Sequence, residues 1–213
     1  MCYEKPEIPQ LTKNRADFSI REDAILYLSC QSLFKYLPQF DQIFAQIAKR
    51  VPQAQFAFIS HDVTAINHQF KARLKRVFAE FNLDSEAYCI LLPRMNYIDY
   101  LNLNLLSEIF LDTFSWSGGN TTLEAIACGL PVVTCPKAFM RGRHAYGILQ
   151  MMGITTTIAQ NEAEYVEIAV KLGLDQEWRQ EISRQITELQ DNVYDDQTCV
   201  TALESFYKQV VGR

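Results

Sequence analysis

The sequence predicts an α/β fold in which a Rossmann-like parallel sheet carries helices on both faces and a helical C-terminal tail follows. Short apolar runs of strand length recur, each followed by a stretch whose apolar residues have helical spacing. From about residue 161 only helical spacing remains. The 213 residues, 48% of them hydrophobic, suffice for one domain with a core. We expect a lead-in or linker over 1–23 and the domain over 24–213.

The individual elements follow from the same pattern, in chain order. The nearly continuous apolar run 24–30 predicts a strand that is buried on both faces of a parallel sheet. A helix should begin near Pro38 and end before Pro52, because proline interrupts helices. The later elements are predicted as strands 55–60, 88–92, 108–112, 131–135 and 155–158, helices 66–81, 97–106, 120–128 and 144–152, and three tail helices around 165–172, 178–189 and 200–210.

Charge and cysteine usage exclude several classes of protein. The chain has 20 Lys and Arg against 25 Asp and Glu, and this net charge of -5 argues against a nucleic-acid partner. No apolar run reaches the roughly 20 residues of a membrane span, and no signal peptide is evident at the start, so we expect a cytoplasmic protein without a membrane partner. The six cysteines form no C-x-x-C pair, which favours buried, reduced thiols over a metal or disulfide framework.

The segments that follow the strands are where a ligand is expected, because open parallel sheets bind ligands beyond the carboxyl ends of their strands. The strongest segment is 115–124, in which Gly118 and Gly119 precede a predicted helix start at Asn120. Glycines let a backbone approach a ligand, and a helix start presents unpaired N–H groups to an anion such as a diphosphate. Thr121 with Glu124 equally fits a helix capping box, so both interpretations stay open.

Other side chains near the strand ends can contribute to such a site. Glu124 can accept hydrogen bonds from ribose hydroxyls, and Lys35 can offset the charge of a phosphate. Arg141 and Arg143 flank a glycine before a predicted helix and offer a second possible anion contact. His144 opens that helix, but the sequence shows no partner for it.

Five runs of residues then carry a family resemblance: Cys30–Lys35, Phe110–Phe114, Ser117–Ala125, Gly129–Thr134 and Phe139–Arg143. They resemble the C-terminal catalytic lobe of the protein O-GlcNAc transferase family, most of all its bacterial branch, whose members often carry tetratricopeptide repeats. The resemblance covers roughly residues 24–190, and it implies one lobe of a GT-B fold.

The resemblance implies an inverting glycosyltransferase that moves a sugar, with GlcNAc the first expectation, from a UDP-sugar to Ser or Thr of proteins. It implies no metal and no cofactor, since the UDP-sugar is the substrate. Family members hold the protein acceptor through an N-terminal lobe and a tetratricopeptide region. Neither is evident in these 213 residues, so we expect the chain to act within a larger enzyme and to be inactive alone.

The resemblance also assigns roles to individual residues. Lys35 matches a catalytic lysine that contacts the donor diphosphate and steadies the departing UDP, and Gln31 falls near a glutamine of that site. Met95, next to Arg94, matches a position whose backbone reads the uracil. The phosphate-binding helix start and the ribose contact correspond to Gly118, Gly119, Asn120, Thr121, Thr122 and Glu124.

Three positions need separate comment. The animal enzymes have histidines where this chain has Tyr100 and Gly119. Arg143 aligns with an arginine of the family, and we expect it to bind the substrate without assigning it a particular contact. Two alternatives to the transferase interpretation stay open. One is a non-catalytic nucleotide-sugar binding or scaffold module with the same fold, and the other is an unrelated doubly wound domain.

Overall fold

Five parallel strands form one sheet within residues 2–212, the part of the chain that the computed structural model describes. The strands lie in the order β3-β2-β1-β4-β5. Their bounds are β1 Ile25–Leu28, β2 Ala54–Ile59, β3 Cys89–Leu92, β4 Ile109–Leu111 and β5 Val132–Val133. Tyr27 of β1 pairs with Phe56 on one side and with Ile109 on the other, so β1 is the central strand. The predicted parallel sheet is confirmed.

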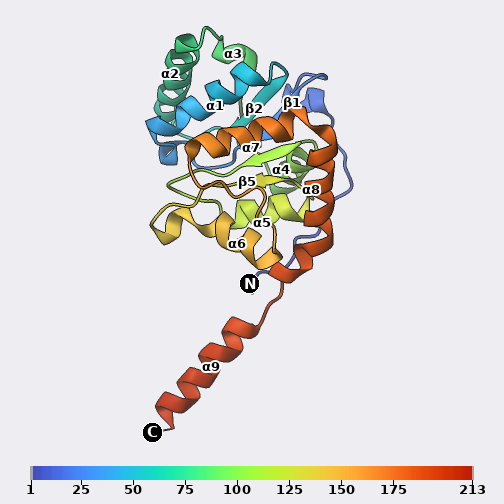
Figure 1. Ribbon diagram of the computed structural model, residues 1–213, viewed down its shortest axis with the longest axis vertical. Coiled ribbons are helices and arrows are strands. Elements are labelled where there is room, and N and C mark those ends of the chain that lie inside the picture. The colour runs from blue at the N-terminus through green and yellow to red at the C-terminus, as the bar shows by residue number, and fades with distance from the viewer. Residues whose placement is uncertain (1, 213) are drawn as a thin grey trace.

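The helices cover both faces of this sheet. They are α1 Pro38–Arg50, α2 Thr64–Glu80, α3 Ser85–Tyr88, α4 Tyr97–Leu105, α5 Asn120–Ala127, α6 His144–Met152, α7 Glu162–Leu174, α8 Gln176–Leu189 and α9 Thr198–Val211. The chain crosses the sheet in one direction from β1 to β3 and then returns to β4 and β5, so right-handed connections place α1 and α2 on one face and α4 and α5 on the other. Figure 1 shows α7 beside α1 and shows α9 projecting away from the body.

Two local predictions differ from the structure. The strand expected at 155–158 is wrong, because only Ile158 forms a bridge, to Thr134, while the residues before it turn: the Ile158 N–H donates to the Thr155 carbonyl at 3.1 Å. The short helix α3 was not expected. It begins where the Asp84 side chain accepts a hydrogen bond from the Glu86 N–H, a cap that needs no apolar periodicity.

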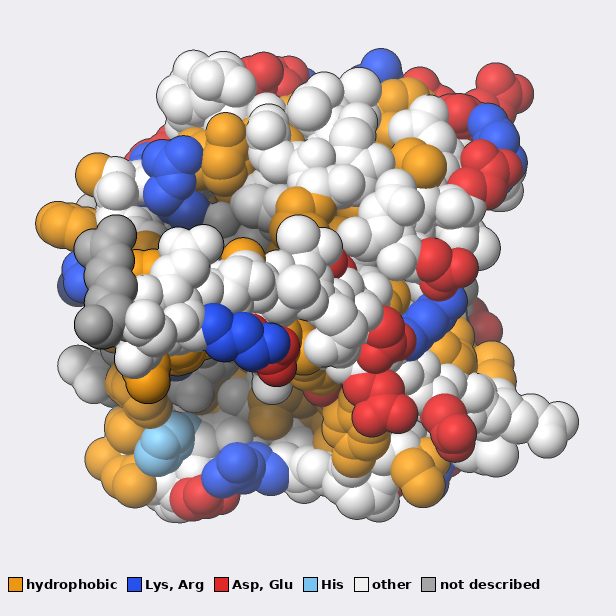
Figure 2. Space-filling view, turned by 90° about the horizontal axis from the view of Figure 1, so that it is seen from below, with side chains coloured by type: hydrophobic (Ala, Val, Ile, Leu, Met, Phe, Trp, Pro, Cys, Tyr) orange, Lys and Arg blue, Asp and Glu red, His pale blue; other side chains and the backbone are white. Residues whose placement is uncertain are grey.

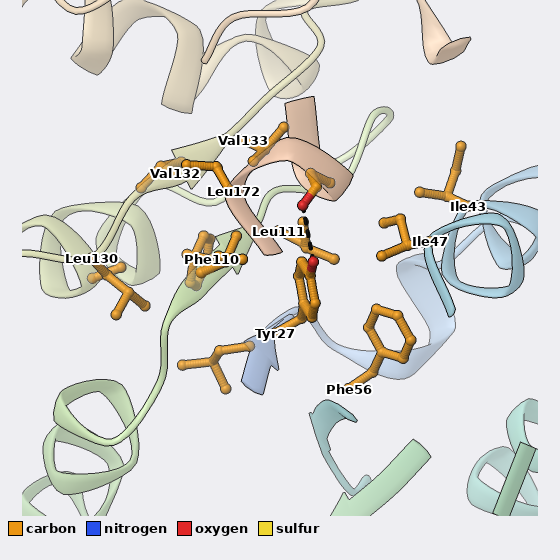
Figure 3. Close-up of a cluster of buried hydrophobic side chains, with 14 of the residues drawn as sticks. Tyr27, Ile43, Ile47, Phe56, Phe110, Leu111, Leu130, Val132, Val133 and Leu172 are labelled. Carbon is orange, nitrogen blue, oxygen red and sulfur yellow. Dashed lines mark hydrogen bonds between the residues drawn. The ribbon is translucent and has the colours of Figure 1, made fainter. Parts of the chain in front are cut away.

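The core is centred on the side chains of the middle strands. Tyr27 is fully buried, packs against Phe56 with ring centroids 5.3 Å apart, and donates a hydrogen bond to the Ala169 carbonyl of α7 at 2.9 Å (Figure 3). Burial raises the pKa of Tyr27, so the hydroxyl stays a donor. A methyl group at Gly173 would overlap this hydroxyl. The glycine thus lets α7 approach the sheet closely.

The segment before residue 24 packs onto the domain. Phe18 and Ile20 are buried in the core, and Arg15 pairs with Glu108 at the start of β4 at 2.5 Å. Just before α9, the Asp195 N–H donates to the Tyr3 carbonyl at 3.0 Å, so the N-terminal segment lies beside the residues that lead into α9. The boundary at residue 23 stays a prediction. No helix within residues 2–212 is long and apolar enough to cross a lipid bilayer.

Candidate functional site

Segments that follow β1, β2, β3 and β4 meet at the carboxyl edge of the sheet and line a cavity of about 300 Å³. The cavity lies where the connections from β1 and β4 diverge to opposite faces, which is the usual ligand position in open α/β sheets. Five of the residues selected from the sequence line it, namely Gln31, Arg94, Met95, Tyr100 and Thr121. Cys30 and His61 line it as well. The structure therefore brings together residues that are far apart in the sequence.

A second cavity, of about 160 Å³, lies against the first residues of the loop that follows β4. Lys35 lines it together with Thr113, Phe114 and Lys137. The Lys35 Nζ lies 5.1 Å from the ring centroid of Trp116, a residue of the segment 115–124 for which the sequence indicated no role of its own. The Gln31 side-chain amide donates to the Trp116 carbonyl at 2.8 Å, so Gln31 and Lys35 both contact the same residue of the loop.

The start of α5 lies beside the first cavity. Gly119 is the N-cap and no side chain caps the helix, so the capping box of Thr121 with Glu124 is wrong. Thr122 is buried, and its hydroxyl donates to the Gly118 carbonyl at 2.7 Å. Asn120 is exposed at the first position of the helix. The first turn of α5 therefore keeps N–H groups that can donate hydrogen bonds to an anion.

Asp112 at the end of β4 holds the loop that leads to α5. Its buried carboxylate accepts hydrogen bonds from the Ser117 hydroxyl at 2.8 Å, the Gly118 N–H at 2.7 Å and the Thr134 hydroxyl at 2.7 Å. Burial outweighs these donors and raises the pKa of Asp112 to about 6. Sequence reasoning missed this role. The only signal was an acidic residue inside an otherwise apolar strand run.

Tyr36 holds the loop that follows β1 in a similar way. Its buried hydroxyl donates to the Ser29 carbonyl at 2.8 Å and accepts from the Gln31 N–H at 3.2 Å. The Tyr36 carbonyl in turn accepts from Arg73, which forms an ion pair with the fully buried Asp41. The backbone on either side of Lys35 is thus fixed from two directions. No sequence pattern indicated that Tyr36 anchors this loop, because the apolar residues around it are typical of any hydrophobic core.

The remaining selected residues lie outside the two cavities or at their rim. Glu124 is buried, and its carboxylate accepts a hydrogen bond from the Tyr97 hydroxyl, while burial raises its pKa. Arg143 donates to the Lys137 carbonyl at 3.3 Å and lines neither cavity. Arg94, at the rim of the first cavity, forms an exposed ion pair with Asp62 at 2.6 Å.

Burial keeps two further groups of the first cavity in their neutral form. It raises the pKa of the Cys30 thiol to about 12 and raises the pKa of Tyr100 as well. Both groups are therefore hydrogen-bond donors at neutral pH. Their position against the cavity suits the recognition of an uncharged polar ligand such as a base or a sugar.

His144, for which the sequence shows no partner, lies close to Gly119 at the start of α5. A Cβ placed on Gly119 would lie 3.8 Å from the His144 Nδ1. The next residue, Ala145, donates its N–H to the Ser117 hydroxyl at 2.8 Å. The start of α6 is therefore attached to the loop before α5.

Another surface hollow, of about 800 Å³, lies between the end of α1 and the α7–α8 corner. It is wide open, and charged side chains such as Arg50 and Glu167 line it. It contains none of the residues selected from the sequence, and it lacks the enclosure and converging polar groups of a ligand site. We therefore place the candidate site at the carboxyl edge of the sheet.

Comparison with curated proteins shows several relatives. The chain is 27% identical over 219 residues to a probable UDP-N-acetylglucosamine–peptide N-acetylglucosaminyltransferase SPINDLY of Hordeum vulgare, covering 100% of this chain and 22% of that protein. It is 26% identical over 171 residues to a UDP-N-acetylglucosamine–peptide N-acetylglucosaminyltransferase of Caenorhabditis elegans, covering 79% of this chain and 14% of that protein. The chain thus spans under a quarter of these relatives.

Solved structures show the same relation. A mutant O-GlcNAc transferase of Thermobaculum terrenum matches with a TM-score of 0.76 and 27% identity, over 88% of this chain and 36% of that one. The C-terminal CMP-Kdo binding domain of WaaA from Acinetobacter baumannii shares the fold at 13% identity, with a TM-score of 0.57 over 82% of this chain and 93% of that one. The predicted fold, a Rossmann-like lobe of the GT-B type with a helical tail, is confirmed. Because the model of Glycosyl transferase family 41 matches residues 3–200, the chain belongs to this glycosyltransferase family.

Proposed function

We propose that the chain is the donor-binding lobe of an inverting glycosyltransferase that moves a sugar from a UDP-sugar, first of all UDP-GlcNAc, to Ser or Thr of proteins. The observation that carries the proposal is the start of α5, which no side chain caps. It lies beside the cavity that contains Met95 and Tyr100, and Lys35 contacts Trp116 in the loop that leads into α5. A nucleoside diphosphate needs such a combination of an enclosed half and an anion-binding half.

The two halves of the donor correspond to the two parts of the site. The base fits the cavity next to Met95 and Tyr100, and the diphosphate extends from there to the N–H groups of Asn120 and Thr121. Lys35 adds a positive charge next to the loop. The Glu124 carboxylate already accepts a hydrogen bond from the Tyr97 hydroxyl, and its remaining lone pairs can accept from the ribose hydroxyls.

The chemistry follows from this placement. The acceptor hydroxyl oxygen forms a bond to C1 of the sugar, and the bond from C1 to the phosphate oxygen breaks. The electron pair of that bond leaves with UDP, and the hydroxyl proton passes to solvent or a base. Negative charge therefore grows on the diphosphate, where Lys35 and the positive end of α5 stabilise it without a metal.

The acceptor half of the reaction belongs to another part of the enzyme in this proposal. The chain spans 22% of the barley relative and 36% of the bacterial transferase chain. We propose that an N-terminal lobe or a tetratricopeptide region holds the protein acceptor, that the complete enzyme is cytoplasmic, and that these 213 residues alone transfer no sugar.

Calorimetric titration of UDP tests the donor site directly. We expect UDP to bind and to raise the melting temperature, because ligand binding to the folded state stabilises it by mass action. Lys35→Ala should weaken UDP binding about tenfold or more, since it removes a charge next to the diphosphate. The matched control is Lys71→Ala, on the exposed face of α2, which should bind like the native chain. The absence of heat and of stabilisation at millimolar UDP would refute the proposal.

A transfer assay separates the enzyme from a mere binding module. The chain is mixed with a UDP-[14C]-sugar and acceptor proteins, alone and together with the N-terminal lobe of a relative. The proposal expects no transfer by the chain alone and transfer by the combined lobes. UDP binding without transfer by the combination would instead identify a non-catalytic nucleotide-sugar module.

A further inference from the structure

Trp116 gathers two positive charges over its ring. Lys35 Nζ lies 5.1 Å and Arg141 Cζ lies 5.0 Å from the centroid of the indole ring. Trp116 itself is 39% exposed. Cations are attracted to the electron-rich face of tryptophan at such distances. Since both charges lie within about 5 Å of one centroid, they are at most about 10 Å apart. Three segments of the chain thus converge at one residue.

Neither charge has an acidic partner in the part of the chain that the structure describes. Among residues 2–212, no carboxylate oxygen lies within 4.0 Å of the Lys35 or the Arg141 nitrogens. The neighbouring Lys137, in contrast, pairs with Glu162 at 3.2 Å. Two adjacent cations repel each other, and in a chain of net charge -5 there is no shortage of carboxylates to neutralise them. The missing counter-charge indicates an anionic ligand.

The surface charge is unevenly distributed in a way that fits this idea. In Figure 2, most Asp and Glu side chains on the visible face gather on one side. On the other side, Lys, Arg and a His lie next to apolar and uncharged polar side chains, with few acidic side chains between them. Positive groups in apolar surroundings are less screened by water and attract anions more strongly.

The backbone fixes Arg141 in this position. The Ser117 N–H donates to the Arg141 carbonyl at 2.7 Å, and Ser117 is also bound to the buried Asp112. The next residue, Gly142, lies so close to the loop that a Cβ there would be 2.7 Å from the Phe114 carbonyl oxygen. The Arg141 loop and the loop that leads into α5 therefore form one rigid unit. This explains why a glycine separates Arg141 from Arg143.

On the basis of the proposed function, we infer that Arg141 is a second cation of the diphosphate site, held by Trp116 next to Lys35. Lys35 alone is a point charge on a flexible stem, whereas a guanidinium donates two parallel hydrogen bonds to a phosphate. Arg141 contacts the phosphate that bears the sugar. It therefore recognises a nucleoside diphosphate and makes little difference to a nucleoside monophosphate.

The test compares UDP with UMP by calorimetry, for the native chain and for Arg141→Ala. We expect Arg141→Ala to weaken UDP binding at least fivefold and UMP binding less than twofold. The matched control is Arg184→Ala, an exposed arginine of α8 that pairs with Glu181 and Glu188, and it should bind both nucleotides like the native chain. Arg141→Ala removes an exposed side chain, so circular dichroism and melting temperature should match the native chain.

Two variants of Trp116 complete the test. Trp116→Phe keeps an aromatic face and should retain UDP affinity within threefold. Trp116→Ala removes the ring that Lys35 and Arg141 share and leaves Arg141 only the Phe139 ring, 4.9 Å from its Cζ, so it should weaken UDP binding more than threefold. If the native chain binds UDP but Arg141→Ala behaves like Arg184→Ala, or loses UMP and UDP equally, the inference about Arg141 is overturned and the proposed function stands. If the native chain binds no UDP, the proposed function itself fails.

Discussion

The buried carboxyl of Asp112 predicts an unusual dependence of stability on pH. Its pKa rises from an ordinary 3.8 to about 6, because burial penalises the charged form more than the three donors favour it. The folded chain therefore holds this proton more tightly than the unfolded chain. The resulting stabilisation is complete below the unfolded pKa and is lost as the pH rises through about 6.

The size of the effect follows from the same values. A rise from 3.8 to about 6 corresponds to about 3 kcal/mol between the two protonation states, of which about 2 kcal/mol is lost between pH ~4 and pH ~7.5. Asp112→Asn removes the titration, so the native chain should lose about 2 kcal/mol of unfolding free energy relative to this variant over that range. Other carboxyl groups titrate equally in both proteins and cancel in the difference.

Urea unfolding followed by tryptophan fluorescence measures this difference at several pH values between ~4 and ~7.5. The matched control is Asp23→Asn, the same substitution at a side chain that is 76% exposed. The reasoning is refuted if the free-energy difference between native chain and Asp112→Asn stays constant across the range. In that case the three hydrogen bonds keep the carboxyl ionised.

Three further predictions concern packing, the loop after β1 and the tail. Gly147→Ala should raise the unfolding free energy by about 0.5–1 kcal/mol, because open space surrounds this glycine of α6. Gly173→Ala should lower the unfolding free energy by about 1–3 kcal/mol, because the added methyl group meets the Tyr27 hydroxyl. Changes of the same sign in urea titrations would contradict this difference in packing. Tyr36→Phe should cost about 1–2 kcal/mol of stability and weaken UDP binding severalfold, because it frees the Gln31 end of the loop; unchanged affinity in calorimetry would show that the loop needs no such anchor. Ending the chain after Gln197 removes α9, none of whose described residues is buried. The melting temperature should therefore change by less than about 2 °C in a thermal scan. A larger fall would reveal a stabilising contact of α9.

The fold was largely predictable because its signals are local. Each strand of the sheet is a short apolar run, and each long helix has a regular apolar face, so β1 to β5 lie where the sequence places them. The strand expected at 155–158 failed for a reason that periodicity does not contain, since a turn at Thr155 leaves only Ile158 in contact with the sheet. The helix α3 was not predicted, because its four residues are too few to show the apolar periodicity of a helix.

The candidate site was predictable only in part, because its organisation depends on contacts between distant residues. The topology rule indicated that the segments after the strands meet at one edge of the sheet, and the resemblance selected Gln31 and Tyr100, which line the cavity there. The supporting roles of Asp112 and Tyr36 are hydrogen bonds to other loops, which no residue pattern encodes. The proximity of His144 to the α5 start likewise appears only when α6 is placed against it.

The position of β1 in the middle of the sheet also determines the order in which the molecule can be assembled. Tyr27 can pair with Phe56 early, but its pairing with Ile109 has to wait until the chain has been synthesised through β4. The half of the sheet that contains β1, β2 and β3 can therefore collapse first on the ribosome, with one edge of β1 still open. Such long-range pairing makes folding slow, and the open, apolar edge is the surface through which newly made chains would aggregate.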